Sequence, residues 1–582
     1  MLMRLFKRVI GASAAVWLGA IGVVHAEPAE FVFDDLIGMA AQIGGSSSEE
    51  REIPEQATNW VPEDRIQFPE SVGPDFGFMA FPPTQWRPPD PDLSVGSDHI
   101  VATVNMQIAI FDKTGNELSN QSIDDFFKEV GGDFFYVDPV TQYDQLTDRF
   151  VVVAGEHEGG DKTKSRLDMA ISKTSNPMDG WWKYRFNLEP YGTYFDFENL
   201  GIGTDAYFVT SDYFDSKGSR LHILAKAPML QGNPVSLKVV SITSQKSISL
   251  APMDMIDTDA PGEYMVTSFS GLRTRLQLYA VEDALGVPKI STYLLPVAFM
   301  ELPPDATQKG TTRLLPVLDF RVKHGVYRHG SMWITQTVGE ENTARVRWYE
   351  IAMNGWPTSG RNPVVRQWGT LDLGIDQHNW FSDIGVDAEG DVVVTCSRSS
   401  SSDFPFISRF VRKADDPLGM IREEVRMMES PDGPYLGSRW GDYGSIDEDP
   451  ADPDVFWSHN EYSGSATNWR TWIGRIDTEQ SMVLAVGEVV RGQTAFFDVS
   501  GSTKNGRVFL VYSLGGFGST NVPGLGVTID LKRPKLGTSG FADGSGRIEF
   551  AIKVPSGVPA VPIWFQAAEN RNTSNVVETM IN

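Results

Sequence analysis

Cysteine is almost absent from this chain: Cys396 is the only one among 582 residues. One thiol cannot form an internal disulfide, so burial of hydrophobic side chains, 41% of the sequence, must hold the fold together. Positive charge is also scarce, because 50 Lys and Arg face 76 Asp and Glu and leave a formal net charge of −26. Such a chain repels phosphate backbones and anionic membranes, and we therefore expect no nucleic-acid partner.

The motifs of several large enzyme classes are missing as well. The sequence has no G-x-S-x-G, no H-E-x-x-H, no phosphate-binding P-loop and no C-x-x-C. Their absence removes support for serine esterase, zinc peptidase, nucleotide hydrolase and thiol redox functions. Cys396 directly follows the strand-like run 392–395 and is predicted to be a core residue.

The first 26 residues have the layout of a cleavable export signal. Arg4, Lys7 and Arg8 precede an uncharged run at 9–24, and Ala26 supplies a small residue for cleavage. An uncleaved anchor is the alternative, but the run is short for a membrane span, which needs about 20 apolar residues. Removal of this segment leaves 47 Lys and Arg against 76 Asp and Glu, a charge of −29. We expect a monomeric secreted protein, periplasmic or extracellular, with no integral membrane segment after cleavage.

Residues 27–92 are predicted to be an extended, Pro-rich leader rather than a domain. Three prolines fall within 88–91 alone. Proline lacks a backbone N–H, and it blocks helices and central strands. The aromatic residues Phe78, Phe81 and Trp86 nevertheless predict that the end of the leader packs along another element.

From about residue 93 the pattern changes to pairs of short strand-like runs with turn residues between them. Seven such units occur, each of roughly 40–55 residues, a period typical of four-stranded β-propeller blades. The expected strand pairs are 100–104 with 107–111, 149–153 with 167–172, 206–210 with 220–224, 263–267 with 275–279, 331–335 with 346–349, 391–395 with 407–410 and 455–458 with 471–475.

Residues 478–582 differ from these units. They alternate short strands with Gly-rich turns, which is typical of an antiparallel β-sandwich. The predicted fold class is therefore all-β, with a seven-bladed β-propeller at 93–477 followed by a C-terminal antiparallel β-sandwich at 478–582.

Several short segments are shared with a known group of proteins. They are Asp138-Pro139, Tyr143-Asp144, Asp148-Arg149-Phe150, Gly180-Trp181-Trp182, Trp380, 383–387, 439–443, Asp449-Pro450 and Phe456-Trp457. In these the chain resembles exported bacterial sialidase-like or BNR-type β-propeller proteins with a C-terminal β-sandwich domain. The resemblance covers most of residues 93–582 and implies the fold more specifically than the activity. The Asp-box of true sialidases has only a loose counterpart at 172–182, and no arginine trio for a carboxylate can be placed.

The densest group of reactive side chains is the segment 439–443, Arg-Trp-Gly-Asp-Tyr, which opens the last unit. We expect it on the ligand side of a propeller, with Asp442 and Glu461 as catalytic carboxylates. The expected ligand-binding residues are Arg439, Trp440, Tyr443, Trp380, Asp383, Glu156 and Asp196. A purely structural alternative is that Arg439 and Asp442 pair between units while the two rings pack. For Glu156 the alternative is a solvated strand end.

Acidic turns near the end of the last unit are candidates for a hard cation. Asp447, Asp449 and Asp452 are the expected metal ligands, and calcium is the expected cofactor because it prefers carboxylate oxygens. The spacing is not that of an EF-hand, and ordinary solvated turns are the alternative.

Together these features predict a secreted propeller that binds an extracellular polysaccharide or glycoprotein. Aromatic planes suit sugar faces, and paired carboxylates suit glycosidic acid–base chemistry, so an enzyme of this kind would be a glycoside hydrolase or a polysaccharide lyase. A fold by itself assigns no activity. The alternative function is a non-catalytic scaffold or adhesion protein that uses the propeller face for protein–protein binding.

Overall fold

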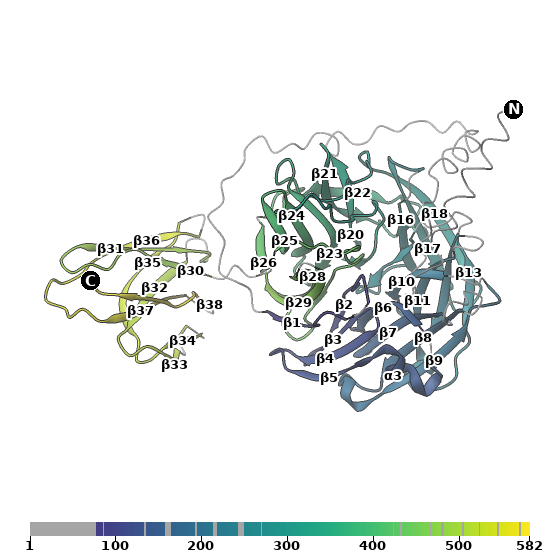
Figure 1. Ribbon diagram of the computed structural model, residues 1–582, viewed down its shortest axis with the longest axis horizontal. Helices are drawn as coiled ribbons and strands as arrows, with labels where there is room; N and C mark the ends of the chain where they lie inside the picture. Colours follow the sequence, from purple (N-terminus) through teal and green to yellow (C-terminus); the bar gives the residue numbers. More distant parts are fainter. Residues whose placement is uncertain are drawn as a thin grey trace. The chain divides into compact units, whose positions relative to one another are not determined.

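The computed structural model describes residues 77–582 except for breaks at 85, 133–134, 158–164, 192–194, 214–217, 243–248, 269–270, 423, 431–432, 466, 479–481, 503–505, 523, 526, 544–545 and 570–571. The expected signal peptide at 1–26 and the leader up to residue 76 lie outside the described residues. In the described part, strands dominate (Figure 1). No helix there is long and apolar enough to cross a membrane. The helical segments are α3 (Ile123–Phe127), η3 (Lys128–Val130), η4 (Pro177–Asp179) and α4 (Lys226–Met229).

Residues 77–477 form seven sheets of four or five strands among those described. The first three sheets contain β2 (Asp92–Val95), β3 (His99–Val104), β4 (Gln107–Asp112) and β5 (Glu117–Ser122); β6 (Phe135–Asp144), β7 (Arg149–His157), β8 (Ser165–Ser172) and β9 (Trp181–Asn187); and β10 (Phe195–Ile202), β11 (Ala206–Tyr213), β12 (Gly218–Ala225) and β13 (Lys238–Ser241).

The next four sheets continue the same order along the chain. They contain β14 (Ala251–Pro252), β16 (Glu263–Thr267), β17 (Arg275–Glu282) and β18 (Lys289–Pro296); β15 (Asp254–Met255), β19 (Gly325–Arg328), β20 (Ser331–Glu340), β21 (Thr343–Ala352) and β22 (Val364–Thr370); β23 (His378–Val386), β24 (Val392–Ser400), β25 (Asp403–Arg412) and β26 (Val425–Glu429); and β27 (Ser445–Glu448), β28 (Val455–Ser465), β29 (Asn468–Asp477) and β1 (Gly77–Met79). All pairings are antiparallel except that of β15 with β19.

The strand pairs expected from the sequence are confirmed, and they are central strands of their sheets. Strands β11, β20 and β24 are buried along almost their whole length. A strand covered by a neighbouring sheet on each face has no solvent side, so apolar residues can follow one another in its sequence instead of alternating with polar ones. This burial explains why these strands could be recognised from the sequence.

Each sheet shares a hydrophobic core with the next one along the chain. The last sheet also shares a core with the first, in which Trp457 and Ile473 meet Ile100 and Phe111. The strands β2, β6, β10 and β23, each the first of its sheet, lie toward the centre of the ring in Figure 1. Such an arrangement is that of a β-propeller, the coarse fold expected from the sequence.

The end of the expected leader takes part in the ring. Strand β1 pairs antiparallel with β29, and Gly77, Phe78 and Met79 stand opposite Gly474, Ile473 and Trp472. Phe81 follows β1 and is completely buried in the core between the last and first sheets. A segment from the start of the chain therefore completes the last sheet, which removes an open strand edge.

The C-terminal region has its own core. Its strands are β30 (Val483–Val486), β31 (Thr494–Ser500), β32 (Arg507–Ser513), β33 (Phe517–Val522), β34 (Val527–Leu531), β35 (Lys535–Phe541), β36 (Ile548–Lys553), β37 (Pro562–Glu569), β38 (Asn572–Thr573) and β39 (Val577–Met580). One sheet has the order β30-β31-β36, another centres on β32 and β37, and β33 pairs with β34. Phe497 of the first sheet packs 4.7 Å from Phe565 of the second, measured between ring centroids.

Replacing Phe81 with Ala should lower the free energy of unfolding by about 3–5 kcal/mol, because it empties a fully buried site at the ring closure. Urea unfolding followed by tryptophan fluorescence measures the change. Phe299→Ala, at a ring that is 56% exposed, is the matched control and should cost less than about 0.5 kcal/mol. Equal losses in the two variants would contradict a closing role for the N-terminal segment.

Candidate functional site

The strands nearest the centre of the ring start in an unusual backbone conformation. Five non-glycine residues at or just before these strands have positive φ: Asp90 (49°), Asp138 (42°), Phe197 (58°), Ser249 (41°) and Phe381 (47°). In β6, β10 and β23 the pairing register shifts at the same point. A left-handed residue and an interrupted ladder bend a strand and redirect the side chains beside it. These corners bring polar groups from different sheets together.

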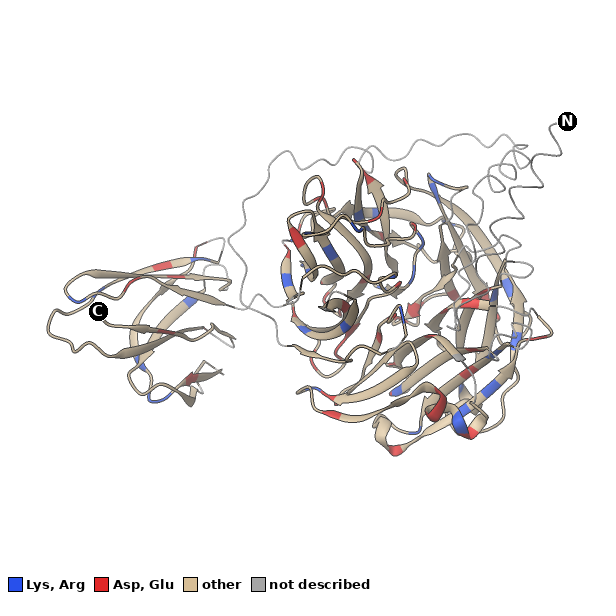
Figure 2. Ribbon diagram, viewed as in Figure 1, with Lys and Arg blue, Asp and Glu red and all other residues tan. Residues whose placement is uncertain are grey.

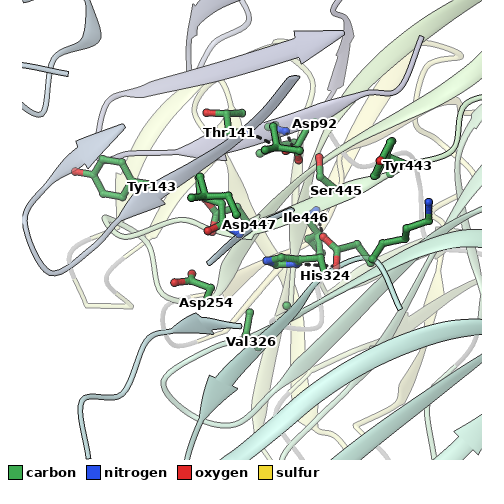
Figure 3. Close-up of a pocket in the computed structure, with 18 of the residues that line it drawn as sticks. Asp92, Thr141, Tyr143, Asp254, His324, Val326, Tyr443, Ser445, Ile446 and Asp447 are labelled. Atoms are coloured by element: carbon green, nitrogen blue, oxygen red, sulfur yellow. Dashed lines mark hydrogen bonds and ion pairs between the residues drawn. The ribbon is translucent and has the colours of Figure 1, made fainter. Parts of the chain in front are cut away.

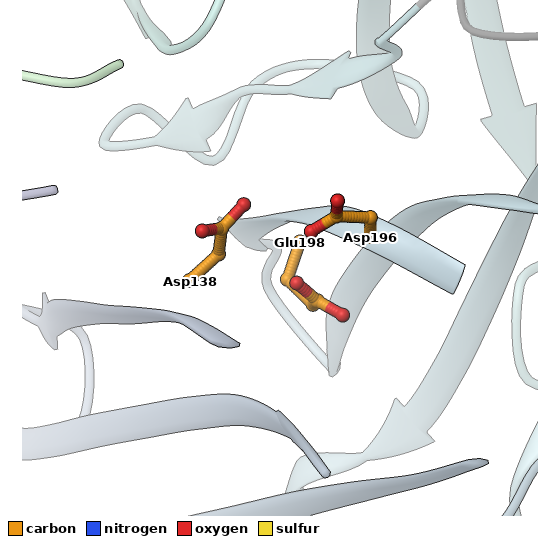
Figure 4. A group of neighbouring side chains, drawn as sticks. All are labelled: Asp138, Asp196 and Glu198. Atoms are coloured by element: carbon orange, nitrogen blue, oxygen red, sulfur yellow. The ribbon is translucent and has the colours of Figure 1, made fainter. Parts of the chain in front are cut away.

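Three carboxylates meet at two of these corners. Asp138 of β6 and Asp196 and Glu198 of β10 each offer an oxygen, and the three oxygens lie within 4.8 Å of one another. Figure 4 shows Asp138 facing the two acids of the neighbouring strand. Glu198 is fully buried, and neither of its carboxylate oxygens accepts a hydrogen bond from a neighbouring residue. The missing side chain of Gly155 makes room for it, since a Cβ there would collide with Glu198 Oε1.

Aromatic and cationic groups border this carboxylate cluster. The Tyr443 hydroxyl donates to Asp138 Oδ2 over 2.9 Å. Lys323 Nζ lies 4.5 Å from the ring centroids of both Phe197 and Tyr443. The Arg321 guanidinium lies 4.3 Å from the Phe197 centroid and is held by Asp319. A polar ligand at this place would meet carboxylates, two cations and two ring faces.

The carboxyl groups of the cluster are shifted toward their protonated forms. Burial is the main cause that raises the pKa of Asp196, and the charge of Asp138 and a hydrogen bond to it raise it further. Burial and the charge of Asp442 raise the pKa of Asp138, although the hydrogen bonds from Tyr443 and Asp196 lower it. A hydrogen bond between two carboxyl groups requires one proton between them. Both carboxyl groups therefore keep a proton to a higher pH than a free aspartate does, which allows one of them to donate to the other.

Segment 439–443 lies beside this cluster and ties parts of the ring together. Arg439 Nη2 donates to Asp442 Oδ2 over 2.6 Å, and the Asp442 amide donates to Asp90 Oδ1 over 2.6 Å. The Gly441 amide donates to Glu461. Asp442 is 5% exposed and Glu461 is 1% exposed. Both carboxylates expected to be catalytic thus have backbone or guanidinium partners in a buried setting, as in the structural alternative.

The two tryptophans of the sequence prediction are core residues in the structure. Trp380 and Trp440 are both buried, and their ring centroids lie 6.2 Å apart. Trp440 Nε1 donates to Ser397 Oγ over 3.1 Å. Neither ring has an exposed face for stacking on a sugar, so their contribution is to hold segment 439–443 in place.

Glu156 is not at a solvated strand end. It is fully buried on β7, and Arg185 Nη2 lies 2.9 Å from its Oε2, with Arg166 Nη1 at 3.6 Å. Arg185 also pairs with Asp168 over 2.7 Å. Arg166 of β8 and Arg185 of β9 lie against this carboxylate, so the alternative of a solvated strand end is wrong, and Glu156 is a buried member of an ion-pair cluster.

The three aspartates expected to bind calcium face different partners. Asp447 accepts from the Val95 amide over 2.8 Å. Asp449 pairs with Lys113 over 2.5 Å, and Asp452 is exposed and pairs with Arg475 over 3.1 Å. Among the described residues, their oxygens are not found within 4.8 Å of one another. In the structure they do not form one site.

A small cavity lies where the strands nearest the centre of the ring meet (Figure 3). Six of the seven sheets contribute residues to its lining, and the exception is the sheet of β14. Its volume of about 60 Å³ suits a few water molecules and is too small for a sugar ring. Asp92, Asp254, Asp383 and Asp447 line it, with His324 as an imidazole among them. Figure 2 shows acidic positions near the centre of the ring as well as on its outside.

His324 and Asp383 form the best-defined pair of this cavity. His324 Nδ1 donates to Asp383 Oδ1 over 2.9 Å, and Asp383 Oδ2 accepts from the Ile446 amide over 3.0 Å. Burial by itself would lower the pKa of His324. The charge and hydrogen bond of Asp383, followed by the charges of Asp254 and Asp92, outweigh burial and raise this pKa to about 9. Asp383 therefore links three sheets through a charged imidazolium.

The sequence interpretation missed several residues that the structure brings together. Asp138 belongs to the Asp-Pro pair that carried the resemblance, but it was not proposed for the site. Glu198 lies two residues from the candidate Asp196, and strand alternation would have placed both on one face. Lys323 and His324 precede β19 and lie outside the strand pairs expected from the sequence, and no spacing of these two residues pointed to a site.

Comparisons with known proteins find distant similarity only. No protein-family model matches the chain, and no curated protein sequence matches it. Among solved structures, a neuraminidase-like protein of subtype N10 from the virus A/little yellow-shouldered bat/Guatemala/060/2010 is similar at 12% identity and a TM-score of 0.34, over 57% of this chain and 97% of that one. An endo-arabinase from Bacteroides thetaiotaomicron gives 12% and 0.29 over 49% and 95%, and Drosophila Semaphorin 2a gives 7% and 0.32 over 87% and 98%. Similarity at this level assigns the chain to no family.

The His324–Asp383 pair predicts a loss of stability in alkali. Because the folded chain holds the imidazolium proton up to about pH 9 and the unfolded chain only to 6.5, the stabilisation is complete below pH 6.5 and is lost as pH rises through 9. The shift corresponds to about 3 kcal/mol. Urea unfolding of the wild type and of His324→Gln between pH 6 and 10 measures it. The variant should show a smaller decrease, and equal decreases would contradict the assignment.

Proposed function

We propose that this chain binds an extracellular glycan, carried on a polysaccharide or a glycoprotein, and hydrolyses it by general acid–base catalysis. The observation that carries the proposal is the close approach of Asp138 and Asp196, whose carboxylate oxygens lie within 4.8 Å of each other in a setting that raises the pKa of both groups. Neighbouring carboxyl groups with unequal proton affinity supply an acid and a base at one pH. Asp196 and Tyr443 are partly exposed, so this pair is open to solvent at its edge.

The roles of the two acids follow from their protonation. Asp196 donates its proton to the glycosidic oxygen as the bond to the anomeric carbon breaks, and Asp138 attacks that carbon as the nucleophile. Water then releases the sugar, with Asp196 as the base. Oxygens within 4.8 Å of each other leave no space for the water that inverting enzymes place between carboxyls about 6.5–9.5 Å apart. The geometry favours retention of configuration.

Lys323 and the rings around it are the proposed sugar-binding groups. Its pKa is lowered to about 8, first by burial and then by the charge of Arg321, so most of it is protonated at neutral pH. Lys323 Nζ is buried and has no hydrogen-bond partner within the described part of the chain. It can therefore bind a carboxylate or hydroxyl of the substrate, while Phe197 and Tyr443 contact the sugar ring. A glycan that contains uronic acids fits this combination best.

Asp442 and Glu461 have a supporting role in this proposal. Asp442 raises the pKa of Asp138 by its charge, and it holds Arg439 and the Asp90 corner in place. Glu461 fixes the Gly441 amide. The expected ligand-binding residues Arg439 and Tyr443 keep a place at the edge of the site.

The fold in which this site sits is proposed to be a seven-bladed propeller of a secreted chain. Support comes from the seven sheets and from the core that joins the last of them to the first. The C-terminal region is proposed to be a β-sandwich, because the sheets of β31 and β32 share one core.

The test of the proposal is glycan cleavage by charge-neutral variants. Asp196→Asn and Asp138→Asn should each lower reducing-sugar release from a polysaccharide panel by at least about 100-fold, because acid–base groups contribute about 10²–10⁴. Binding to a glycan array should remain. Asp452→Asn removes an exposed carboxylate from a turn and is the matched control, with unchanged release.

Three other results would contradict the mechanism. Unsaturated products with new ultraviolet absorbance would indicate a lyase. Normal release by both Asp138 and Asp196 variants would exclude the pair as catalytic. A wild type that neither cleaves nor binds glycans would favour the scaffold or adhesion function.

The same pair predicts how activity depends on pH. The rate should fall at low pH as Asp138 is protonated, and at high pH as Asp196 loses its proton, with both limits above the usual carboxyl range because both pKa values are raised. Removing the Asp442 charge in Asp442→Asn should move the acidic limit downward. A profile measured as kcat/KM on the best polysaccharide checks this, and an unmoved limit would contradict the coupling.

A further inference from the structure

A second group of three acids lies at the ends of the strands nearest the centre of the ring. These are the finishing ends of the strands, whereas Asp138 and Asp196 lie near the starting ends. Asp387 and Glu389 belong to the turn that follows β23, and Asp454 belongs to the loop between β27 and β28. Each offers one carboxylate oxygen, and the three oxygens lie within 4.8 Å of one another. The group therefore joins the turns of two neighbouring sheets.

Asp387 is the fixed member of this group. It is completely buried, and its Oδ1 accepts from the amides of Glu389 over 3.0 Å and of Asp391 over 2.8 Å. Its Oδ2 has no hydrogen-bond partner among the residues that the structure describes. A buried carboxylate oxygen without a partner costs free energy unless a ligand satisfies it. This orphaned oxygen is the observation that separates the group from an ordinary acidic turn.

The cations near the group are already paired elsewhere. Lys413 binds Asp391, and Arg328 binds Glu448. His329 Nε2 lies 3.1 Å from the carbonyl oxygen of Asp387 rather than from its carboxylate. In the described chain no Lys, Arg or His side chain is found in an ion pair with Asp387 or Glu389.

We propose that Asp387, Glu389 and Asp454 bind one calcium ion. Three carboxylates supply hard oxygen donors, and water can fill the remaining positions because Glu389 is exposed. Calcium tolerates irregular arrangements of six to eight oxygens, whereas magnesium requires a near-ideal octahedron that two loops of different sheets do not provide. The bound ion would hold the β23–β24 turn against the β27–β28 loop.

The proposed site differs from the one expected from the sequence. That expectation placed calcium on Asp447, Asp449 and Asp452, in the same acidic stretch that ends at Asp454. The structure instead pairs the last acid of the stretch with two acids more than 60 positions earlier. Asp452, two residues from Asp454, is therefore a natural discriminator between the two sites.

The experiment is calcium titration of the full exported chain after removal of metals with a chelator. Isothermal titration calorimetry should show one calcium ion per chain with a Kd in the range of about 10⁻⁴–10⁻³ M, which is typical of extracellular sites. Calcium should also raise the melting temperature, and magnesium at the same concentration should raise it less. Asp387→Asn keeps the Oδ1 acceptor and should weaken calcium binding at least tenfold, and Glu389→Gln should do the same.

Asp452→Asn is the matched control and should bind calcium like the wild type. Because Glu389 is exposed, Glu389→Gln still tests the site if Asp387→Asn fails to fold. Absence of calcium binding by the wild type, normal binding by both Asp387→Asn and Glu389→Gln, or loss of binding in Asp452→Asn would each overturn the proposal. An equal response to magnesium would overturn the choice of calcium. Glycan cleavage uses none of these residues, so the two proposals fail separately.

Discussion

The core between the last and first sheets is the contact on which the rest of the ring depends. Every central strand is covered on both faces by a neighbouring sheet, and an open ring would expose one face of two sheets. Closure uses residues from both ends of the ring: β1 completes the sheet of β29, and Phe81 fills the core beneath it. Without a disulfide, this burial is the means by which the ring is held shut.

Closure also assembles the candidate site. Asp442 and Tyr443 belong to the last sheet of the ring, whereas their partners Asp90 and Asp138 belong to the first two sheets, more than 300 positions away. Asp138 and Asp196 lie in the adjacent second and third sheets, so their own contact does not cross the closing seam. Closure adds the hydrogen bond from Tyr443 to Asp138 and the charge of Asp442, which together with burial raises the pKa of Asp138.

The sequence predicted the fold well for strands that a neighbouring sheet covers on each face. The apolar runs of β7, β11, β20 and β24 could be recognised because each is covered on both faces. The strands nearest the centre could not, because they carry Gly and Asp among their apolar residues, and β6, β10 and β23 are bent at left-handed residues that no period-2 pattern describes. Strand β1 was hidden for another reason: its three residues pair with a strand almost 400 positions later.

The site was predictable only in part, and for a physical reason. Segment 439–443 has the composition of a ligand site, but composition cannot distinguish a carboxylate that meets a ligand from one that accepts a backbone amide. In the structure, Asp442 accepts a hydrogen bond from the Arg439 guanidinium, and Glu461 accepts one from the Gly441 amide. Both carboxylates therefore already have partners within the protein. Asp196 was chosen by its position at the start of a unit. Its partner Asp138 becomes apparent only from the neighbouring sheet.

The two groups of acids lie at opposite ends of the strands nearest the centre of the ring. Asp138 and Asp196 lie where β6 and β10 begin, whereas Asp387 follows the end of β23 and Asp454 precedes β28. At the starting ends, burial and neighbouring charges raise the pKa of both aspartates, and Lys323 lies against the rings beside them, which suits reversible proton transfer. At the finishing ends, one carboxylate oxygen of Asp387 has no hydrogen-bond partner among the described residues, which suits exchangeable binding of a cation. Three acids at each end are therefore proposed to serve different chemistry, because the side chains around them differ.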